Sequence, residues 1–155
     1  MIESPTAFEA WKQALTLLLD QGRQYKDVRG RVCIEVANLQ VMVQHTEQLT
    51  IPIEHLQNLE EWIYPSLQEI AEIMLVREAS QIYGYVYGAR LFHHADCVNQ
   101  VNDFVIPLLK KDPTSRRAIA VVFDPLKDAN PKARDVPGLV SLDFKIRDGQ
   151  LHLTA

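Results

Sequence analysis

The sequence is poor in cysteine. Its 155 residues include two, Cys33 and Cys97, which lie far apart in the chain. Neither a disulfide framework nor a cysteine-rich metal site has this number and spacing, so we expect both to be reduced, apolar side chains in a cytoplasmic protein. The neighbouring residues His93, His94 and Asp96 also lack a further histidine or cysteine at a suitable spacing, and we predict no metal site there.

Long apolar runs and a surplus of basic residues are missing as well. No apolar stretch approaches the roughly 20 residues that a membrane-spanning helix needs. Near the N-terminus, Glu3, Pro5 and Glu9 interrupt the kind of apolar run that a secretory signal contains. The 20 acidic residues outnumber the 16 basic ones and give a net charge of −4, whereas proteins that bind polyanions usually carry excess basic charge. We therefore predict neither a membrane partner nor a nucleic-acid partner.

Apolar residues, by contrast, are plentiful. They make up 47% of the 155 residues, which is enough to bury a core. Because this length is typical of one domain, residues 1–155 are expected to form a single domain.

Three helices are predicted from local patterns. Thr6 followed by Glu9 has the pattern of a capping box, and the helix that begins there should end at Gly22. Its expected core face consists of Phe8, Trp11, Leu15, Leu18 and Leu19. Ser66 followed by Glu69 predicts a second helix, and the polar stretch before it, over residues 45–57, is expected to be irregular. A third helix is expected over residues 96–109, with a kink or an early end at Pro107.

Strands are predicted as well, and the two kinds of element together indicate an α+β fold in which helices cover a mixed β-sheet. Alternating apolar residues over 32–36 and 39–43 predict two strands that pair with each other. The apolar run over 118–123 is typical of a central strand covered on both faces. Asp148-Gly149, between two alternating segments, predicts a hairpin. Alternation also predicts an extended segment with three rings on one side, those of Tyr83, Tyr85 and Tyr87.

A charged turn leads into the apolar run at 118–123. It reads Asp112-Pro113-Thr114-Ser115-Arg116-Arg117. A guanidinium presents a fixed fork of donors that suits phosphate oxygens, and neighbouring strand residues point to opposite faces, so Arg116 and Arg117 can serve two different sites. Since Asp-Pro and Ser-Arg also occur in ordinary loops, a solvated turn is the alternative.

The order of segments from Tyr87 to the end of the chain resembles thymidylate synthase and its pyrimidine hydroxymethylase relatives. The segments that carry the resemblance are Tyr87-Gly88-Ala89-Arg90-Leu91, Val98-Asn99-Gln100-Val101 with Val105 and Leu108-Leu109 after it, the turn at 112–117, Phe123-Asp124-Pro125, Val136-Pro137-Gly138, and residues 142–153. The turn is similar to the family's Asp-Pro-x-Ser-Arg-Arg. The resemblance implies a thymidylate synthase-like fold that is dimeric through its sheets.

The resemblance also shows a missing nucleophile. The family's catalytic cysteine follows a proline, and the residue that follows Pro137 here is Gly138. As the resemblance implies, the family reaction begins when the thiolate adds to C6 of the pyrimidine, which makes C5 nucleophilic toward the one-carbon unit of methylenetetrahydrofolate. Glycine cannot add to the ring, and neither Cys33 nor Cys97 matches the position. We therefore assign no catalytic residue, and expect a folate only if the family activity survives.

What the resemblance implies for binding is a phosphate site. Arg116, Arg117 and Ser115 are expected to hold a nucleotide phosphate, and in a homodimer the two arginines reach the phosphate bound in the partner subunit. Tyr87 and Pro137 are other possible site residues.

Two further assignments are looser. Family members have an Arg-bearing loop before their first strand, and Arg29 matches it best in position. Other basic residues crowd the same stretch, namely Arg23, Lys26 and Arg31. The family also has a glutamate that relays protons, and the candidates here are Glu60, Glu61 and Glu72.

The expected ligand is therefore a pyrimidine mononucleotide, dUMP or dCMP, bound by a protein that is inactive as a methyltransferase. The alternative is a non-catalytic interaction or scaffold protein that keeps only the fold. Family members continue past the position of Ala155 into segments that hold phosphate and read the base, so we expect a shortened C-terminus, and the preferred base stays open.

Overall fold

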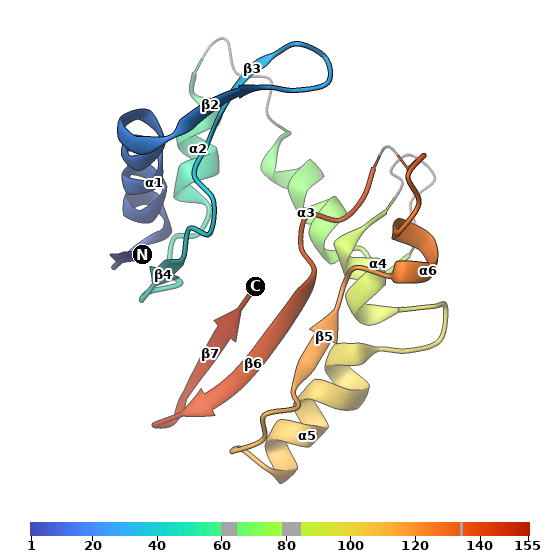
Figure 1. The fold of residues 1–155 in the computed structure, drawn as a ribbon. Coiled ribbons are helices and arrows are strands. Elements are labelled where there is room, and N and C mark those ends of the chain that lie inside the picture. The colour runs from blue at the N-terminus through green and yellow to red at the C-terminus, as the bar shows by residue number, and fades with distance from the viewer. Residues whose placement is uncertain (60–64, 79–84, 134) are drawn as a thin grey trace. The chain divides into compact units, whose positions relative to one another are not determined.

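The structure is a computed structural model that describes residues 1–59, 65–78, 85–133 and 135–155, without the side chain of Ile73. Residues Met1–Leu67 and Gln68–Ala155 form two compact units, here called the N-terminal and C-terminal units (Figure 1). Helices occur together with parallel and antiparallel strand pairs, which confirms the α+β prediction. Among the described residues, no helix is both long and apolar enough to cross a membrane. The single domain over residues 1–155 stays a prediction.

Helix α1, Ala7–Gln21, begins and ends where the sequence predicts. The Thr6 hydroxyl accepts a hydrogen bond from the Glu9 backbone N–H at 3.2 Å, which satisfies one of the free donors of the first turn. The Glu9 carboxylate lies 2.6 Å from Lys12 Nζ. Gly22 is the C-cap, as expected.

The predicted core face of α1 is only partly correct. Phe8 and Trp11 contact the His55 ring, with centroids 5.4 and 6.2 Å away. Leu15 and Leu19 are 41% and 77% exposed, so the core prediction is wrong for these two residues. Neighbouring elements decide how much of an amphipathic face is covered, and spacing along the helix does not report on them.

Helix α2, Ile51–Gln57, contradicts the prediction that residues 45–57 are irregular. Pro52 lies in its first turn, where a backbone N–H has no partner within the helix and its absence costs nothing. Glu54 adds a negative charge near the positive end of the helix dipole. These are signals of a helix start inside a polar sequence.

The strands of the N-terminal unit pair differently from the prediction. Strands β2, Arg23–Lys26, and β3, Val32–Glu35, form an antiparallel pair. Strands β1, Ile2–Ser4, and β4, Val41–Val43, form a parallel pair. The two strands predicted here are therefore present as β3 and β4, but their mutual pairing is wrong.

A turn between β2 and β3 explains the change of partner. One Asp27 carboxylate oxygen accepts hydrogen bonds from the backbone N–H groups of Arg29 and Arg31, at 2.8 and 2.9 Å. The other oxygen accepts from Arg31 Nε at 2.6 Å. This short-range closure holds β2 beside β3. Val32 and Ile34 are 64% and 41% exposed, so the half-buried character predicted for this strand is also wrong.

The next two helices lie between α2 and the charged turn at residues 112–117. Helix α3, Leu67–Leu75, confirms the helix predicted from Ser66 onward. Helix α4, Tyr87–Phe92, begins where an extended segment was expected, so that prediction is wrong for Tyr87, while Tyr83 lies outside the described residues.

The next helix has two parts. Segment η1, Gln100–Val105, is π-helical, and α5, Ile106–Lys111, is α-helical. Asn99 caps the start, so the helix begins later than the predicted residue 96. Pro107 does not end it, because this proline falls in the first turn of α5, where the hydrogen-bond pattern changes and its missing N–H is not needed.

The strands of this unit form one antiparallel sheet in the order β5-β6-β7. Their bounds are Ile119–Val121, Ser141–Arg147 and Gln150–Thr154. Asp148 and Gly149 have φ values of 52° and 75°, which confirms the predicted hairpin turn. Strand β5 lies at an edge of this sheet, so the prediction of a central strand is wrong for the sheet as described.

Only one face of β5 is fully buried. The inward residues Ala118, Ala120 and Val122 have no exposed surface, whereas Ile119 and Val121 are 40% and 41% exposed. The inward face packs against helix residues Val105 and Leu109 and against β6 residues Leu142, Phe144 and Ile146. Figure 1 shows α5 alongside this sheet. The apolar run thus predicts the strand correctly but not its cover on both faces.

Candidate functional site

The charged turn follows directly from α5. The Asp112 carboxylate accepts hydrogen bonds from the Thr114 backbone N–H at 3.1 Å and from the Thr114 hydroxyl at 2.8 Å. The Ser115 N–H donates to the Asp112 carbonyl at 3.1 Å. These short-range bonds hold residues 112–115 in a defined turn.

Ser115 connects this turn to the arginine pair. Its side chain is buried, at 5% exposure, and its Oγ accepts the Arg117 N–H at 3.4 Å. The next residue, Ala118, is fully buried, so the turn is anchored to the core on both sides of the pair. Ser115 was predicted to contact phosphate, and in this structure its hydroxyl contacts the backbone.

Arg116 and Arg117 are exposed. Within the described ranges, neither guanidinium has a carboxylate or hydrogen-bond partner, so the two positive charges are not neutralised by the turn that carries them. Exposed arginines on a turn anchored in this way can bind an anion without first breaking an ion pair. The prediction that this turn binds phosphate is therefore physically reasonable, and it stays a prediction.

Arg29 lies in the other unit, in the turn closed by Asp27. Its backbone N–H takes part in that closure, and its side chain is exposed. The Asp27 carboxylate has a pKa below its usual 3.8, chiefly because the Arg31 backbone N–H donates to its charged form. A role for Arg29 in phosphate binding stays a prediction.

Tyr87 and Gly138, which the sequence singles out separately, lie close together. A Cβ atom added to Gly138 would lie 4.0 Å from the Tyr87 hydroxyl oxygen, Oη, which is the nearest atom it would meet among the described residues other than its chain neighbours. Pro137 is buried, whereas Gly138 is exposed. Within the part of the chain that the structure describes, the first group that a side chain at position 138 would meet beyond its chain neighbours is therefore a phenol.

Gly88, the residue after Tyr87, lets the backbone of α4 come close to the end of α3. A Cβ atom at Gly88 would lie 2.2 Å from the Val76 carbonyl oxygen, which no side chain can tolerate. Only glycine therefore allows α4 to pack against the residues that follow α3. Tyr87, the first residue of α4, directly precedes this close contact.

Tyr85 is a neighbour of Tyr87 that the sequence did not assign to the site. The two rings meet edge to face with centroids 5.2 Å apart, and the two Oη atoms are 3.4 Å apart. The hydrogen bond with Tyr87, together with burial and the charge of Asp135, raises the pKa of Tyr85 to about 12, and a backbone bond with Gly138 acts in the opposite direction. The alternation of the tyrosines was the signal that could have identified this pair.

A buried ion pair supports the same region. Arg90 Nη2 lies 2.7 Å from Asp128 Oδ1, and both side chains are nearly buried, at 11% and 6% exposure. The other Asp128 oxygen accepts the Asp124 N–H at 2.7 Å, just before the short helix α6, Pro125–Asp128. This network joins α4 to the end of β5. Asp-Pro is a readable helix start, but the partner Arg90 lies 38 residues away in the sequence and no local pattern reveals it.

Gln100 makes a second link between these elements. Its amide nitrogen donates to the Arg90 carbonyl at 2.8 Å and to the Val121 carbonyl at 2.7 Å. Its amide oxygen accepts the Val121 N–H at 2.9 Å. The side chain therefore pairs with the free edge of β5 as a neighbouring strand would.

The remaining candidates add no further site. Glu72 is exposed and accepts a hydrogen bond from Gln68 Nε2 at 3.3 Å, whereas Glu60 and Glu61 lie outside the described residues. Cys33 and Cys97 have free thiols. Across the parts of the chain that the structure describes, no three histidine, cysteine or acidic side chains are grouped as metal ligands would be.

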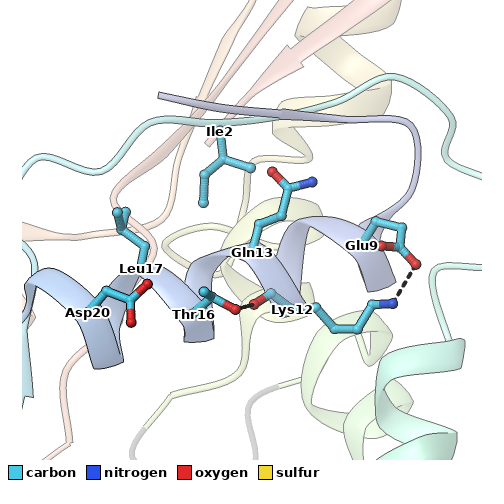
Figure 2. Close-up of a pocket in the computed structure, with 7 residues that line it drawn as sticks. All are labelled: Ile2, Glu9, Lys12, Gln13, Thr16, Leu17 and Asp20. Carbon is cyan, nitrogen blue, oxygen red and sulfur yellow. Dashed lines mark hydrogen bonds and ion pairs between the residues drawn. The ribbon is translucent and has the colours of Figure 1, made fainter.

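A hollow of about 450 Å³ lies along α1 in the N-terminal unit (Figure 2). Its lining residues are Ile2, Glu9, Lys12, Gln13, Thr16, Leu17 and Asp20. Figure 2 shows the Lys12 side chain paired with Glu9, and the Thr16 hydroxyl directed at the Lys12 carbonyl. None of the residues predicted for the phosphate site lines this hollow.

Comparison with known proteins gives a consistent result. No family model matches the chain. A protein of Methanosarcina barkeri named "Putative thymidylate synthase" is 36% identical over 154 residues, which cover 99% of this chain and 67% of that protein. A protein of the same name from Methanothermobacter thermautotrophicus is 30% identical over 164 residues, covering 99% and 72%. The deoxyuridylate hydroxymethyltransferase of Bacillus phage SP01 is 37% identical over 78 residues, covering 44% of this chain and 20% of the phage protein.

Proposed function

The chain belongs to the thymidylate synthase family, and from this membership we propose that it binds a pyrimidine mononucleotide, dUMP or dCMP, through the turn at residues 112–117. The single observation that carries the proposal is the exposed, unneutralised pair Arg116 and Arg117 on a turn anchored by buried Ser115 and Ala118. A monophosphate carries up to two negative charges, and two guanidinium groups match it in charge and in donor geometry. Arg29 is the proposed third phosphate ligand.

We propose that the protein lacks the family's covalent chemistry in this form. A methylenetetrahydrofolate would supply a one-carbon unit to a pyrimidine made reactive by a nucleophile, and Gly138 offers none. The free thiols Cys33 and Cys97 do not stand at that position. Gly138 therefore does not fit a folate-dependent transfer.

A cytoplasmic homodimer completes the proposal. In the family arrangement that the resemblance implies, Arg116 and Arg117 reach the phosphate bound by the partner subunit. Their lack of a partner among the described residues supports this role, since side chains that act on a neighbouring subunit need no partner in their own.

A thermal-shift titration with dUMP and dCMP tests the binding proposal. A ligand that binds only the folded state stabilises it by about 2.7 kcal/mol at 100 times its dissociation constant, which corresponds to several degrees in Tm for a chain of this size. We expect this shift with at least one of the two nucleotides, and we expect Arg116→Glu and Arg117→Glu to abolish it. Lys132→Glu is the matched control, because it makes the same charge change at an exposed residue outside the turn.

Two further arms of this titration separate the alternatives. Inorganic phosphate and AMP, at the same concentrations, show whether the base contributes. A folded protein that responds to none of these ligands would overturn the binding proposal and support the alternative, an interaction or scaffold protein that has kept the fold. Glycine at position 138, in place of a nucleophile, agrees with both functions, nucleotide binding without catalysis and an interaction or scaffold role.

A further inference from the structure

The Gln100 side chain connects three elements, η1, α4 and β5. Its amide nitrogen donates one hydrogen to the Arg90 carbonyl in α4, at 2.8 Å, and the other to the Val121 carbonyl in β5, at 2.7 Å. Its amide oxygen accepts the Val121 N–H at 2.9 Å. The opposite amide orientation would set this oxygen against two carbonyl oxygens, so the partners themselves fix the direction of each bond.

Both ends of this connection are held by further bonds. Gln100 is the first residue of η1, where the Asn99 side chain caps the segment. Arg90 also binds Asp128 through its guanidinium at 2.7 Å, so its carbonyl lies in a part of α4 that a nearly buried ion pair holds. A water molecule could satisfy the Val121 backbone, but it would not be tied to α4. Gln100 therefore fixes where the edge of β5 lies relative to α4.

The same edge of β5 leads to the arginine pair. In an antiparallel sheet, the backbone groups of alternate residues point to the same edge. The Ala118 carbonyl accepts a hydrogen bond from β6, whereas the N–H groups of Ile119 and Val121 point to the opposite edge. There the Ile119 N–H donates to the Arg117 carbonyl at 2.9 Å. One short edge thus carries both the Gln100 contact and the bond to Arg117.

Strand β5 is too short for its two ends to move independently. It consists of Ile119–Val121, which span about 10 Å. A change in its tilt at Val121, where Gln100 binds, therefore also moves the end from which Arg117 leads. The Arg117 N–H donates to buried Ser115 at 3.4 Å, and this long bond by itself holds the arginine only weakly.

We propose that Gln100 is a positioning residue for the arginine pair. By tying the edge of β5 to α4, it fixes how Arg117 is presented to a bound phosphate, and it acts through β5 without touching the phosphate itself. The inference rests on the proposed function for the identity of this ligand. Its first test needs no nucleotide, so failure of nucleotide binding and failure of this inference are distinguishable.

Gln100→Met provides the test, because methionine keeps the length and approximate volume of glutamine but has neither its donor nor its acceptor. Hydrogen exchange in the ligand-free protein is measured by NMR at the amides of Ile119 and Val121. We expect exchange at Ile119 to become about three- to tenfold faster, although its own acceptor, the Arg117 carbonyl, is still present. Unchanged exchange at Ile119 would show that Gln100 acts only on Val121, and would overturn the proposal.

Nucleotide affinity is a second readout, which a merely structural role of Gln100 would not change. Calorimetric titration, at a temperature where both proteins are folded, should show about three- to tenfold weaker binding by Gln100→Met than by the natural chain. Equal affinities would overturn the proposal. A natural chain that binds neither dUMP nor dCMP would overturn the proposed function, and hydrogen exchange at Ile119 would then decide whether Gln100 positions Arg117.

Two control variants should bind the nucleotide like the natural chain. Asn102→Ala changes an exposed side chain in the same segment as Gln100. Thr6→Ala removes the cap of α1 in the N-terminal unit, which lowers stability without touching β5. Weaker binding by Thr6→Ala, equal to that of Gln100→Met, would show that lost stability alone explains the effect, and the proposal would fail.

A measurement on the natural chain covers the case in which Gln100→Met does not fold. If the Gln100 contact and the bond to Arg117 open together, the amides of Ile119 and Val121 should have protection factors that agree within about threefold. Much faster exchange at Ile119 than at Val121 would show that the two bonds open separately, which contradicts the proposed positioning.

Discussion

At the scale of single residues, the chemistry of this protein depends on a few groups whose surroundings differ sharply. Arg116 and Arg117 are exposed and have no partner among the described residues, whereas Arg90 is nearly buried and pairs with Asp128 at 2.7 Å. The first two can bind an external anion at little cost. Arg90 cannot, because removing it from Asp128 would leave a buried carboxylate without its counter-charge. The same residue type is thus proposed to bind a ligand at Arg116 and Arg117, whereas Arg90 has a structural role in the ion pair with Asp128.

The phenol pair gives a residue-scale prediction about pH. The folded-state pKa of Tyr85, about 12, lies above its ordinary value of 10.0. The hydrogen bond therefore stabilises the folded state fully below about pH 10, and this contribution is lost as the pH rises from about 10 to about 12. Urea unfolding at pH 8, 10 and 11 should show a steeper loss of stability in the natural chain than in Tyr85→Phe. An equal loss of stability with pH in the two proteins would contradict this prediction.

Arg90 gives a second prediction at this scale. Arg90→Ala leaves the Asp128 carboxylate buried without its charge partner, so we expect a loss of about 3 kcal/mol or more in the free energy of unfolding. Arg90→Lys should recover only part of this, because an ammonium group lacks the fork that spans both Asp128 and Asp124. Denaturant unfolding measures both, and the exposed Arg147→Ala is the control. A loss below about 0.5 kcal/mol in Arg90→Ala would contradict the assignment.

At the scale of elements, side-chain hydrogen bonds decide which backbone segments meet. Asp27 closes the turn that pairs β2 with β3, and Gln100 occupies the free edge of β5. In both cases one side chain makes hydrogen bonds to the backbone that a further stretch of backbone could also make. A strand edge satisfied in this way is also less available for pairing with another chain.

Gln100→Ala tests the role of this residue at the edge of β5. Three hydrogen bonds are lost, but solvent can reach Val121, which is 41% exposed, so we expect a loss of about 1–2 kcal/mol rather than the sum of three bonds. We also expect faster hydrogen exchange at the Val121 amide, because its acceptor is removed. Asn102→Ala, at an exposed position of the same π-helical segment, is the matched control. Unchanged exchange at Val121 would show that Gln100 does not hold this edge.

The turn at Asp27 gives an element-scale prediction with the opposite dependence on pH. Its folded pKa is below the ordinary 3.8, so the turn is stabilised above that value and the stabilisation is lost as the pH falls through the folded pKa. NMR shifts of the Arg29 and Arg31 amides should follow this titration at acid pH, and Asp27→Asn should remove it. Amide shifts that stay constant from pH 5 to pH 2 would rule out the closure.

At the scale of the whole molecule, the predictions concern cooperativity and assembly. A single domain over residues 1–155 should unfold in one transition, with equal calorimetric and van't Hoff enthalpies. Differential scanning calorimetry measures both, and two separate transitions would contradict the single-domain prediction.

Dimerisation is measured separately, by sedimentation equilibrium over a range of concentrations. We expect a dimer mass, together with a Tm that rises with protein concentration, since association stabilises the folded state by mass action. A monomer at every concentration would exclude the proposed role of Arg116 and Arg117 across a subunit interface.

The sequence by itself determined the local features. Thr6 as the cap of α1, the hairpin at Asp148 and Gly149, and the turn that carries Arg116 and Arg117 all follow from residues close together in the chain. The family also follows from the sequence, because the ordered segments from Tyr87 onward carry the resemblance that the comparisons support. Such features are set by hydrogen bonds and backbone preferences over a few residues, which a linear pattern records.

Only the tertiary structure decided which distant residues meet. It paired β4 with β1 instead of β3, placed β5 at a sheet edge, left Leu19 exposed, and brought the Arg90 and Asp128 side chains together. It also placed Tyr87, with Tyr85 beside it, next to Gly138. The physical reason is that burial and long-range pairing depend on which surfaces compete for the same neighbour, and this competition is resolved only when the chain packs.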